Sequence, residues 1–464
     1  MTNRIDGSAI AAEVAVNNFA DERLTRRLEK TLVSLARDPA ASLPCALTSA
    51  ELEGAYRFFS NPIVTPESIL GPHFAATRAR CATAPRVRIV HDTTQFSYKR
   101  QTRRDGFDDA FGFKNFYGHF SMAVASDASR MPLGLVALKT WPRGEKGVTH
   151  SAWLSQIEAS ATLLGDSARA TIHVCDRGAD DYDLFARLIA TGHRFVIRAG
   201  RDRWTNSGLD DTPEKLRSVL AKVEHEADRE AKLNPRGRHA RAAFRKIHPP
   251  RETRTATLHI AATRLQIVRP ANYREGNDRG RVSPTIDLNV VRVWEPSPPA
   301  GETPIEWILF TTEPIDTSAN VLAIVDDYRA RWMIEEYFKA LKTGCAFERR
   351  QLHDYESRLN ALAVFAPLAF HVLLLRTMAR LQPQSAATTV VSDDHLEVLR
   401  ALGRRPLPPS PTARDALLAI AALGGHIKYA PDPGWLTIAR GYEKLEVLTA
   451  GWRAGKLQRH RDQR

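Results

Sequence analysis

The sequence predicts an α/β protein of several domains, in which a mixed sheet is flanked by helical segments. At 464 residues the chain exceeds the roughly 250–300 residues at which a single hydrophobic core stops growing. Short runs rich in β-branched residues fill its first half after a helical start, and helical periodicity returns later. We expect five parts: a helical region (1–70), a core (71–200), a β-rich insertion (201–315), the second part of the core (316–382) and a helical region (383–464).

The first part, residues 1–70, is expected to contain a helix in "DERLTRRLEKTLVSLARDP". Asp38 and Pro39 predict its end, and apolar residues recur at helical spacing at Leu24, Leu28, Leu32 and Leu35. The same segment carries five basic residues, Arg23, Arg26, Arg27, Lys30 and Arg37. They form either a solvated helix face or a surface that binds nucleic acid.

The core is expected to begin with the strands "RVRIVHD", "GHFSMAVAS" and "LGLVALKTW". A helical stretch, "SAWLSQIEASATLLG", then separates them from "ATIHVCD" and "HRFVIRA", which predicts a mixed sheet with an antiparallel start. Alternation carries two of these strands toward Asp92 and Asp176, each predicted at or near a strand end. Two carboxylates there suggest a metal site, although a single Asp is more often a turn former or helix cap.

The insertion contains alternating runs such as "ATLHIAA" and "RLQIVRP", expected as two strands. Its basic segment 234–254 is broken by proline and is interpreted as a solvated loop, with a phosphate-binding role as the alternative. Residues 316–382 return to helix and include an apolar stretch that predicts a buried core helix. In residues 383–464, "LQPQSAATTVVSDDH" and "RRPLPPSPTARD" resemble exposed linkers before a helical pair interrupted by Gly and Pro.

The stretch "YRARWMIEEYFKALKTG" predicts one continuous helix. At 100° per residue, four polar side chains fall within about 60° of one another beside an apolar arc, namely Tyr328, Arg331, Glu335 and Lys342. The simplest interpretation is a salt bridge between residues four apart. That interpretation gives no role to the phenol of Tyr328 or to the ammonium of Lys342. Metal-dependent phosphodiester chemistry would use all four, with the carboxylate on the metal and the others on the scissile phosphate.

The net charge of +13 and isoelectric point near 9.7 are typical of a protein that neutralises phosphates, although a basic solubility bias produces the same totals. Four widely separated cysteines without a Cys-x-x-Cys pair argue against a disulfide framework or a zinc site, and we expect buried, reduced thiols. We expect a cytoplasmic protein without a membrane partner, because the N-terminus lacks the apolar core of a secretory signal.

These motifs resemble those of the insertion-sequence-four family of bacterial DDE transposases. Residues 328–342 match its Tyr-x2-Arg-x3-Glu-x6-Lys signature, while "HDTTQFSY" and "VCDRGADDYDLFARL" resemble the strands of its first and second Asp. The similarity continues through "EGAYRFFSNP", "GETPIEWILFTTEP" and "AIAALGGHIK", and so follows nearly the whole chain in order. Three separated motifs in the correct order are far more specific than a single one.

The resemblance implies an RNase H-like catalytic core, interrupted by the β-rich insertion between the second and third acidic residues. Asp92, Asp176 and Glu335 would be the catalytic triad and would hold two Mg²⁺ ions, with Mn²⁺ as an expected substitute. Members of the family cut the transposon ends, pass through a DNA hairpin and join the 3′-hydroxyl ends to target DNA. The implied partner is double-stranded DNA, namely terminal inverted repeats and the target.

The resemblance also implies DNA contacts by Tyr328, Arg331 and Lys342. Trp307 would stack on a flipped base, its alternative being an ordinary strand aromatic. Arg198 matches a DNA-contacting Arg of the family and Trp332 would line the same groove, with structural support as the alternative for each. Arg23, Arg27 and Arg57 match positions that contact terminal-repeat DNA. One departure is visible at Leu24, where a close member has another Arg. The N-terminal part would bind DNA ends, and the C-terminal helical pair would form a homodimer on paired ends.

Two other functions fit parts of the pattern. A non-catalytic DNA-end-binding repressor of transposition would need no acidic triad, and all three acidic residues are intact. A stand-alone RNase H-like nuclease would need neither Trp307 nor a dimerising C-terminus. The sequence therefore favours a cut-and-paste transposase.

Overall fold

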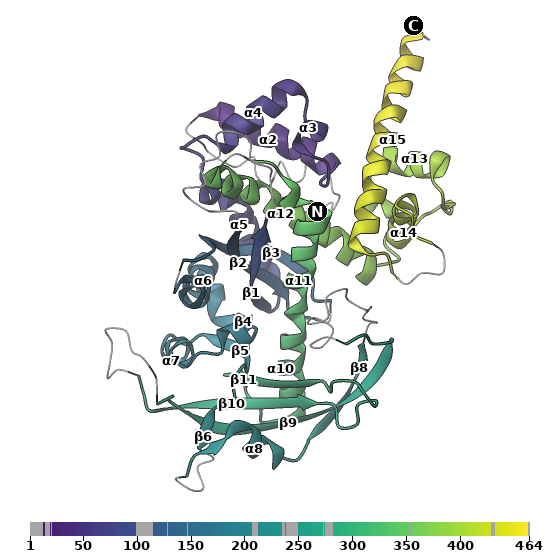
Figure 1. Cartoon of the computed structure of the whole chain (residues 1–464). Coiled ribbons are helices and arrows are strands. Elements are labelled where there is room, and N and C mark those ends of the chain that lie inside the picture. Colours follow the sequence, from purple (N-terminus) through teal and green to yellow (C-terminus); the bar gives the residue numbers. More distant parts are fainter. Residues whose placement is uncertain are drawn as a thin grey trace.

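The computed structural model (Figure 1) describes most of the 464-residue chain. The described residues are 13, 19, 21–98, 115–127, 129–145, 147–206, 212–233, 237, 249–271, 273, 282–352, 354–427 and 432–462. The predicted basic segment 234–254 lies mostly outside them.

Within the described ranges, eleven strands form one sheet in the order β3-β2-β1-β4-β5-β11-β10-β9-β6-β7, with β8 pairing with β9. The strands are β1 (Val87–Ser97), β2 (Asn115–Ala125), β3 (Pro132–Pro142), β4 (Ile172–Cys175), β5 (Arg194–Arg198), β6 (Trp204–Asn206), β7 (Glu214–Lys215), β8 (Ala227–Leu233), β9 (Arg254–Val268), β10 (Thr285–Trp294) and β11 (Glu306–Thr311). In the first half of this order, β3, β2 and β1 are antiparallel, and β1, β4 and β5 are parallel. The predicted mixed sheet with an antiparallel start is therefore confirmed.

Helices surround this sheet. They are α2 (Glu22–Arg37), α3 (Leu43–Ala46), α4 (Ser49–Phe59), α5 (Pro66–Thr83), α6 (Val148–Leu164), α7 (Tyr182–Ala190), α8 (Leu216–Ala221), α10 (Ser318–Ala330), α11 (Trp332–Lys339), α12 (Tyr355–Leu381), α13 (Asp393–Leu402), α14 (Ala413–Leu423) and α15 (Trp435–Asp462). A π-helical segment, Ala340–Gly344, follows α11 directly.

The β-rich insertion extends the core sheet. Strand β11 pairs antiparallel with β5 over three residues and with β10 over six, so the insertion continues the hydrogen-bonded ladder of the core. The prediction of two separate strands in the middle of the insertion was wrong, because "ATLHIAA" and "RLQIVRP" belong to the single strand β9. Thr263 and Arg264 join the two runs, and pairing of both residues with β10 keeps them extended.

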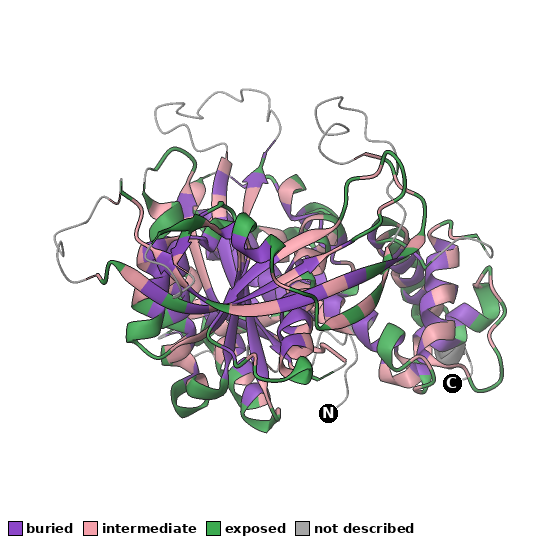
Figure 2. Ribbon diagram, turned by 90° about the horizontal axis from the view of Figure 1, so that it is seen from below, coloured by how far each residue is buried: buried purple, intermediate pink, exposed green. Residues whose placement is uncertain are grey.

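The two faces of the sheet are covered by different helices (Figure 1). Along β5, Phe195 and Ile197 pack with residues of α6, α7 and α8, whereas Val196 packs with residues of α10. This alternation follows from the two-residue period of a strand. Figure 2 shows the buried residues gathered along the central strands and the exposed residues toward the periphery. Helices α10 and α11, whose buried residues belong to the cluster of Val196, therefore lie on one face of the sheet.

The N-terminal helix forms as predicted. Asp21 caps α2 by accepting a hydrogen bond from the Arg23 N–H, and the four predicted leucines are buried. Helix α5 runs across the expected limit at residue 70 and packs on β3 and on α12. The helical N-terminal region and the sheet therefore share one hydrophobic cluster.

Helix α12 is the predicted buried core helix. It is long and apolar enough to cross a membrane by length and composition, yet 82% of its most apolar window is buried inside the protein. Core helices of soluble proteins share these properties. Its packing partners include α2, α4, α5, α11, the π-helical segment, α14 and β3, so it joins the N-terminal helices, the sheet and the C-terminal helices.

The C-terminal helices α13, α14 and α15 form a separate hydrophobic cluster. The prediction of an exposed linker at 381–395 was wrong in part, because Ala387, Val390 and Val391 are buried in this cluster. The expectation of four buried thiols also needs one correction, since Cys45 is exposed, while the other three cysteines are buried and all four are free. Cys45 lies on the four-residue helix α3, which buries Leu43 and leaves Cys45 exposed.

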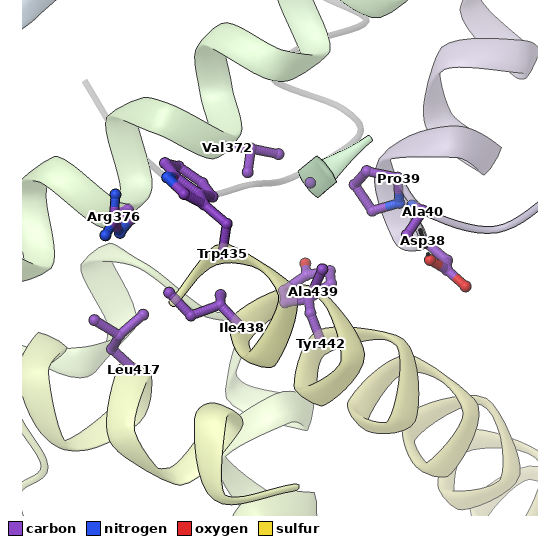
Figure 3. A pocket seen from close by; sticks show the side chains of 11 residues that line it. Asp38, Pro39, Ala40, Val372, Arg376, Leu417, Trp435, Ile438, Ala439 and Tyr442 are labelled. Carbon is purple, nitrogen blue, oxygen red and sulfur yellow. Dashed lines mark hydrogen bonds between the residues drawn. The ribbon is translucent and has the colours of Figure 1, made fainter. Parts of the chain in front are cut away.

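An apolar pocket marks the junction of the C-terminal helices with the rest of the molecule (Figure 3). Trp435 of α15 points toward Val372 and Arg376 of α12, and Pro39 contributes from the N-terminal region. Gly344, at the end of the π-helical segment, also lines this pocket. The C-terminal helices thus touch the segment that follows α11.

Candidate active site

Asp92 lies in the middle of β1. The prediction of a strand end was wrong, because β1 continues to Ser97 and Asp92 pairs with Phe120 of β2. Antiparallel pairing with β2 keeps the polar residues that follow Asp92 extended. Its side chain is mostly buried and accepts a hydrogen bond from the Thr93 N–H at 2.8 Å.

Asp176 follows the last residue of β4, as predicted. Its Oδ1 accepts a hydrogen bond from the Gly178 N–H at 2.7 Å, which caps the short turn after the strand. Strand β4 runs parallel to β1, with Val174 beside Val90. Two residues further along both strands, this register brings Asp176 beside Asp92.

Glu335 lies near Asp92, although it comes from a much later part of the chain. The guanidinium of Arg331 donates to Asp92 Oδ2 at 3.0 Å and also to Glu335 Oε1. The predicted pairing of Arg331 with Glu335 is therefore present, but it does not stand alone. One cation joins a carboxylate of β1 to a carboxylate of α11, and these lie more than two hundred residues apart in the sequence.

The crowding of the acidic residues appears in the pKa of Asp92. Burial and the neighbouring charge of Asp176 raise this pKa to about 7, with a smaller contribution from Glu335, although Arg331 opposes them. Like charges close together destabilise the ionised form, and an added cation relieves that cost. A hard divalent ion prefers such a set of carboxylate oxygens. The three acidic residues therefore fit a divalent metal.

Arg331 stands between two carboxylates of the acidic triad, whose ligating atoms do not all lie within 4.8 Å of one another. Among the described residues, one group of three or more potential ligands has all its ligating atoms within 4.8 Å of one another, and it lies elsewhere, at His225, Asp228 and His259. In the acidic triad the Arg331 guanidinium stands between Asp92 and Glu335. Although burial opposes it, Tyr328, Glu335 and Asp92 together raise the pKa of Arg331. This guanidinium is the counter-charge of the site.

The prediction of one continuous helix over residues 328–344 was wrong. The Arg331 N–H bonds to the Tyr328 carbonyl, three residues back, so the chain tightens between α10 and α11. After Lys339 it widens into the π-helical segment, where the Cys345 N–H bonds to the Ala340 carbonyl. Single π-helical turns are frequent at functional sites.

Lys342 lies on the π-helical segment and reaches β1. Its Nζ donates to the Gln95 carbonyl at 2.5 Å and lies 5.1 Å from the ring centre of Phe96. Burial lowers the pKa of Lys342 against the attraction of Glu348. The predicted polar stripe is therefore distributed along β1, with Arg331 at Asp92 and Lys342 three residues further on.

Tyr328 and Trp307 lie side by side. Their ring centres are 5.5 Å apart at an angle of 60°, with Tyr328 buried and Trp307 half-buried. Arg198 supports this corner, because its Nη2 donates to the carbonyl of Glu306, the residue before Trp307, at 3.1 Å. The aromatic side chain of β11 is thus placed next to the helix that carries Arg331.

The remaining predicted residues are exposed or half-buried. Trp332, three residues before Glu335, is 54% exposed, with the Lys339 ammonium 5.0 Å from its ring centre. Arg23 is exposed, Arg57 is exposed and paired with Glu53, and Arg27 is half-buried over Gly54. Leu24, the departure from the family pattern, is a buried residue of the N-terminal core.

Sequence reasoning missed a chain of buried histidines behind the acidic residues. His91 Nε2 lies 2.9 Å from His173 Nδ1, and the Ser121 hydroxyl lies 2.9 Å from His91 Nδ1. Burial holds the pKa of His91 well below its usual range. Alternation along "VHD" and "HVCD" could have placed both histidines behind their strands, but the contact depends on the pairing of β1 with β4.

A second missed residue is Glu336, next to Glu335. Its carboxylate accepts hydrogen bonds from Lys339 and Trp435 at 2.8 and 3.0 Å, and also from Arg376. Burial favours its neutral form, yet these partners hold the pKa of Glu336 at about 2. Helix α11 thus turns one acidic residue toward β1 and the next toward α12 and α15.

A mixed sheet that brings three carboxylates together from β1, β4 and a following helix fits an RNase H-like catalytic core. Comparison with protein families gives the class more closely. Residues 6–64 match a transposase DNA-binding family, and residues 143–366 match the transposase DDE domain. The second match includes Asp176 and Glu335, while Asp92 precedes it. The two matches, in this order along one chain, support a DDE transposase.

Proposed function

We propose that this protein is a cut-and-paste DNA transposase of the insertion-sequence-four family, similar above all to the transposase of transposon five. It binds the terminal inverted repeats of its element, nicks them and excises the element through a DNA hairpin. It then joins the 3′-hydroxyl ends to target DNA. The two family matches support DNA binding and a DDE catalytic domain. The individual steps are our inference.

The convergence of Asp92, Asp176 and Glu335 carries this proposal. Two of the carboxylates share the Arg331 guanidinium, and the third is close enough to raise the pKa of Asp92. A non-catalytic DNA-binding protein would have no use for this arrangement. Three carboxylates are crowded here in a partly buried position, which destabilises their ionised forms.

A DDE domain implies use of a divalent metal, usually Mg²⁺. We propose that the three carboxylates hold two Mg²⁺ ions, or Mn²⁺ as a substitute, which would polarise the phosphate and lower the pKa of an attacking hydroxyl or water. Arg331 releases the carboxylates when their charge is neutralised. Its guanidinium is then free to donate two hydrogen bonds to a phosphate.

Other side chains position the DNA in this proposal. Lys342 and Tyr328 contact the backbone on either side of Arg331. Trp307 accepts a flipped base from the strongly bent strand, and stacking of this kind stabilises a base by about 1–3 kcal/mol. Trp332 and Lys339 offer an exposed aromatic ring and a cation near Glu335. Arg198 holds the backbone before Trp307 and supports the stacking position.

Arg23, Arg27 and Arg57 are proposed to contact the terminal repeats, because they lie within the matched DNA-binding region. The C-terminal helices are proposed to dimerise, so that two protomers hold a pair of ends in the cytoplasm. The net charge of +13 favours association with DNA and predicts strong weakening of binding by salt.

The test uses DNA fragments that carry the inverted repeats flanking the gene. The protein should nick these ends only with Mg²⁺ or Mn²⁺ and should convert them to hairpins, which denaturing gels detect. Glu335→Gln should abolish nicking while retaining end binding in a mobility-shift assay. The matched control is Glu158→Gln, an exposed position on α6 distant in sequence from the triad, which should leave both activities unchanged.

The same assay separates the alternatives. Binding without any cleavage by the unaltered protein would support a transposition repressor. Nicks that never proceed to hairpins would support an RNase H-like nuclease. Loss of end binding in Glu335→Gln would assign this residue to folding and would remove it from the chemistry.

A further inference from the structure

Two histidines and an aspartate converge on the β-rich insertion, away from the acidic triad. His225 Nε2 lies 3.7 Å and His259 Nε2 lies 3.6 Å from the same oxygen, Asp228 Oδ1. The two imidazole rings are stacked, with ring centres 4.1 Å apart and an angle of 16° between their planes. Both rings therefore present the same edge to one carboxylate.

Strand pairing places these side chains in one row across the sheet. Asp228 of β8 is the direct partner of His259 of β9, which is in turn the partner of Trp294 of β10. The neighbours of His259, Leu258 and Ile260, are buried in the cluster that contains α10. Because side chains alternate along a strand, His259 and its row lie on the opposite, outer face of the sheet.

The side chain of Trp294 borders the group of two histidines and one aspartate. The Trp294 ring stands edge-on to His259, with centres 5.5 Å apart and an angle of 77°, and it is similarly oriented to His225 at 6.5 Å. The guanidinium of Arg292 lies over the same Trp294 ring, 4.5 Å from its centre. Trp294 thus borders a group whose three ligating atoms all lie within 4.8 Å of one another.

We propose that His225, Asp228 and His259 form a binding site for a borderline transition-metal cation, with Zn²⁺ as the reference ion. Imidazole nitrogen with one carboxylate oxygen is a donor set that suits Zn²⁺, Co²⁺, Ni²⁺ or Cu²⁺, whereas Mg²⁺ prefers oxygen alone. Zn²⁺ bonds of about 2.0–2.1 Å in a tetrahedral site require ligand atoms roughly 3.4 Å apart. The two nitrogen-to-oxygen separations exceed this by only a few tenths of an ångström, and all three ligating atoms lie within 4.8 Å of one another. Because the rings are stacked, binding requires the imidazoles to rotate so that both nitrogen lone pairs point at the ion.

The position of the site suggests what the cation does. Three protein ligands leave at least one coordination position open, and His225 and Asp228 are 45% and 55% exposed, so solvent or another molecule reaches it. His225 precedes β8, while His259 lies within β9. A bound cation therefore fastens the segment before β8 to the long central strand of the insertion.

The test measures metal binding directly on untagged, full-length protein. In excess Mg²⁺, which occupies oxygen-only sites, Co²⁺ should bind one equivalent per chain and give the visible d–d absorption of a nitrogen and oxygen site. Zn²⁺ should displace Co²⁺ and should raise the melting temperature. His225→Ala and His259→Ala should each weaken binding about 10-fold or more, with Asp228→Asn weakening it less.

Two control variants make the result specific. His150→Ala removes another exposed histidine, whose Nε2 lies 3.4 Å from Asp181 Oδ1. This pair contains one histidine, whereas the proposed site contains two. Cys45→Ser removes the exposed thiol. Both variants should bind Co²⁺ as the unaltered protein does. Circular dichroism of every variant confirms that the fold is retained.

Several outcomes would overturn the site. Binding that survives in both His225→Ala and His259→Ala places the ion elsewhere. A sulfur-to-cobalt charge-transfer band that disappears in Cys45→Ser assigns it to the thiol. Absence of saturable Co²⁺ and Zn²⁺ binding by the unaltered protein leaves only two stacked histidines beside an aspartate. None of these measurements depends on transposase activity.

Discussion

Arg331 connects two carboxylates of the candidate active site. It donates to Asp92 and to Glu335, so the strand and the helix that supply these carboxylates are connected by one side chain. A planar guanidinium can bridge two carboxylates or grip a phosphate with two parallel hydrogen bonds, whereas an ammonium cannot. The proposed exchange of carboxylates for phosphate depends on this geometry.

The variant Arg331→Ala tests that exchange. We expect DNA cleavage to fall by about 10- to 100-fold, because a charged hydrogen bond contributes roughly 1.5–3 kcal/mol. We also expect Mn²⁺ to raise the melting temperature more in this variant than in the unaltered protein, because the cation no longer competes with the guanidinium. Differential scanning fluorimetry with and without Mn²⁺ measures the second effect. An equal shift in both proteins would contradict the counter-charge role.

Trp307→Ala tests the base-stacking role. Loss of the ring should reduce hairpin formation about 10-fold or more while the first nick changes little, because only the bent strand requires a flipped base. Time courses on end-containing DNA separate the two products. The comparison variant is Trp204→Ala, which removes an exposed Trp from the short strand β6. Equal loss of nick and hairpin would indicate that Trp307 only packs against Tyr328.

At the scale of elements, α11 connects the acidic triad to the C-terminal helices. Glu335 faces β1, while Glu336 accepts hydrogen bonds from α12 and from Trp435 at the start of α15. Consecutive helical residues are separated by 100°, so neighbouring carboxylates serve different partners. The π-helical segment that follows α11 packs against both α12 and α15.

Glu336→Gln tests this connection. The neutral amide leaves Arg376 without its buried partner, and we expect the free energy of unfolding to fall by about 1.5–3 kcal/mol. Chemical denaturation measures the change. Glu53→Gln is the matched control, because its ion pair with Arg57 is exposed and such pairs contribute about 0–1 kcal/mol. Equal effects of the two variants would contradict a buried connection between α11 and the C-terminal helices.

At the scale of the whole molecule, the buried histidines predict sensitivity to acid. Burial lowers the pKa of His119 and of His173 to about 3, and that of His91 well below its usual range. Below a pH of about 6.5 the unfolded chain binds protons at these residues that the folded chain excludes, so the free energy of unfolding falls with pH. The raised pKa values of Asp92, about 7, and of Asp38 and Asp327 act in the opposite direction, whereas the lowered pKa values of His73 and His193 act in the same direction as those of the three histidines.

The expected slope is up to about 1.4 kcal/mol per pH unit for each buried histidine between pH 6.5 and 3. Urea denaturation in the absence of divalent metal, at pH 7 and at pH 5.5, measures it. His173→Asn should reduce the slope by the contribution of about one proton. A free energy of unfolding that stays constant or increases on acidification would contradict neutral histidines behind the sheet.

Much of the fold was predictable because it depends on local patterns. The leucine spacing of α2 and its end at Asp38, the helix α6 and the strand leading to Asp176 were all predicted from alternation or helical periodicity. The break at Arg331 and the π-helical segment were not. They depend on contacts of Arg331 and Lys342 with β1, more than two hundred residues away, which local spacing cannot reveal.

The sequence by itself determined which residue types are available, with their spacing along each strand and helix, because short-range periodicity decides which side chains share a face. Only the tertiary structure decided that Asp92 lies within a strand, that Arg331 bridges two carboxylates and that the insertion extends the core sheet through β11 and β5. The physical reason is that pairing between distant segments is selected by packing of the whole chain. Neighbouring residues in the sequence therefore do not reveal which distant segments pair.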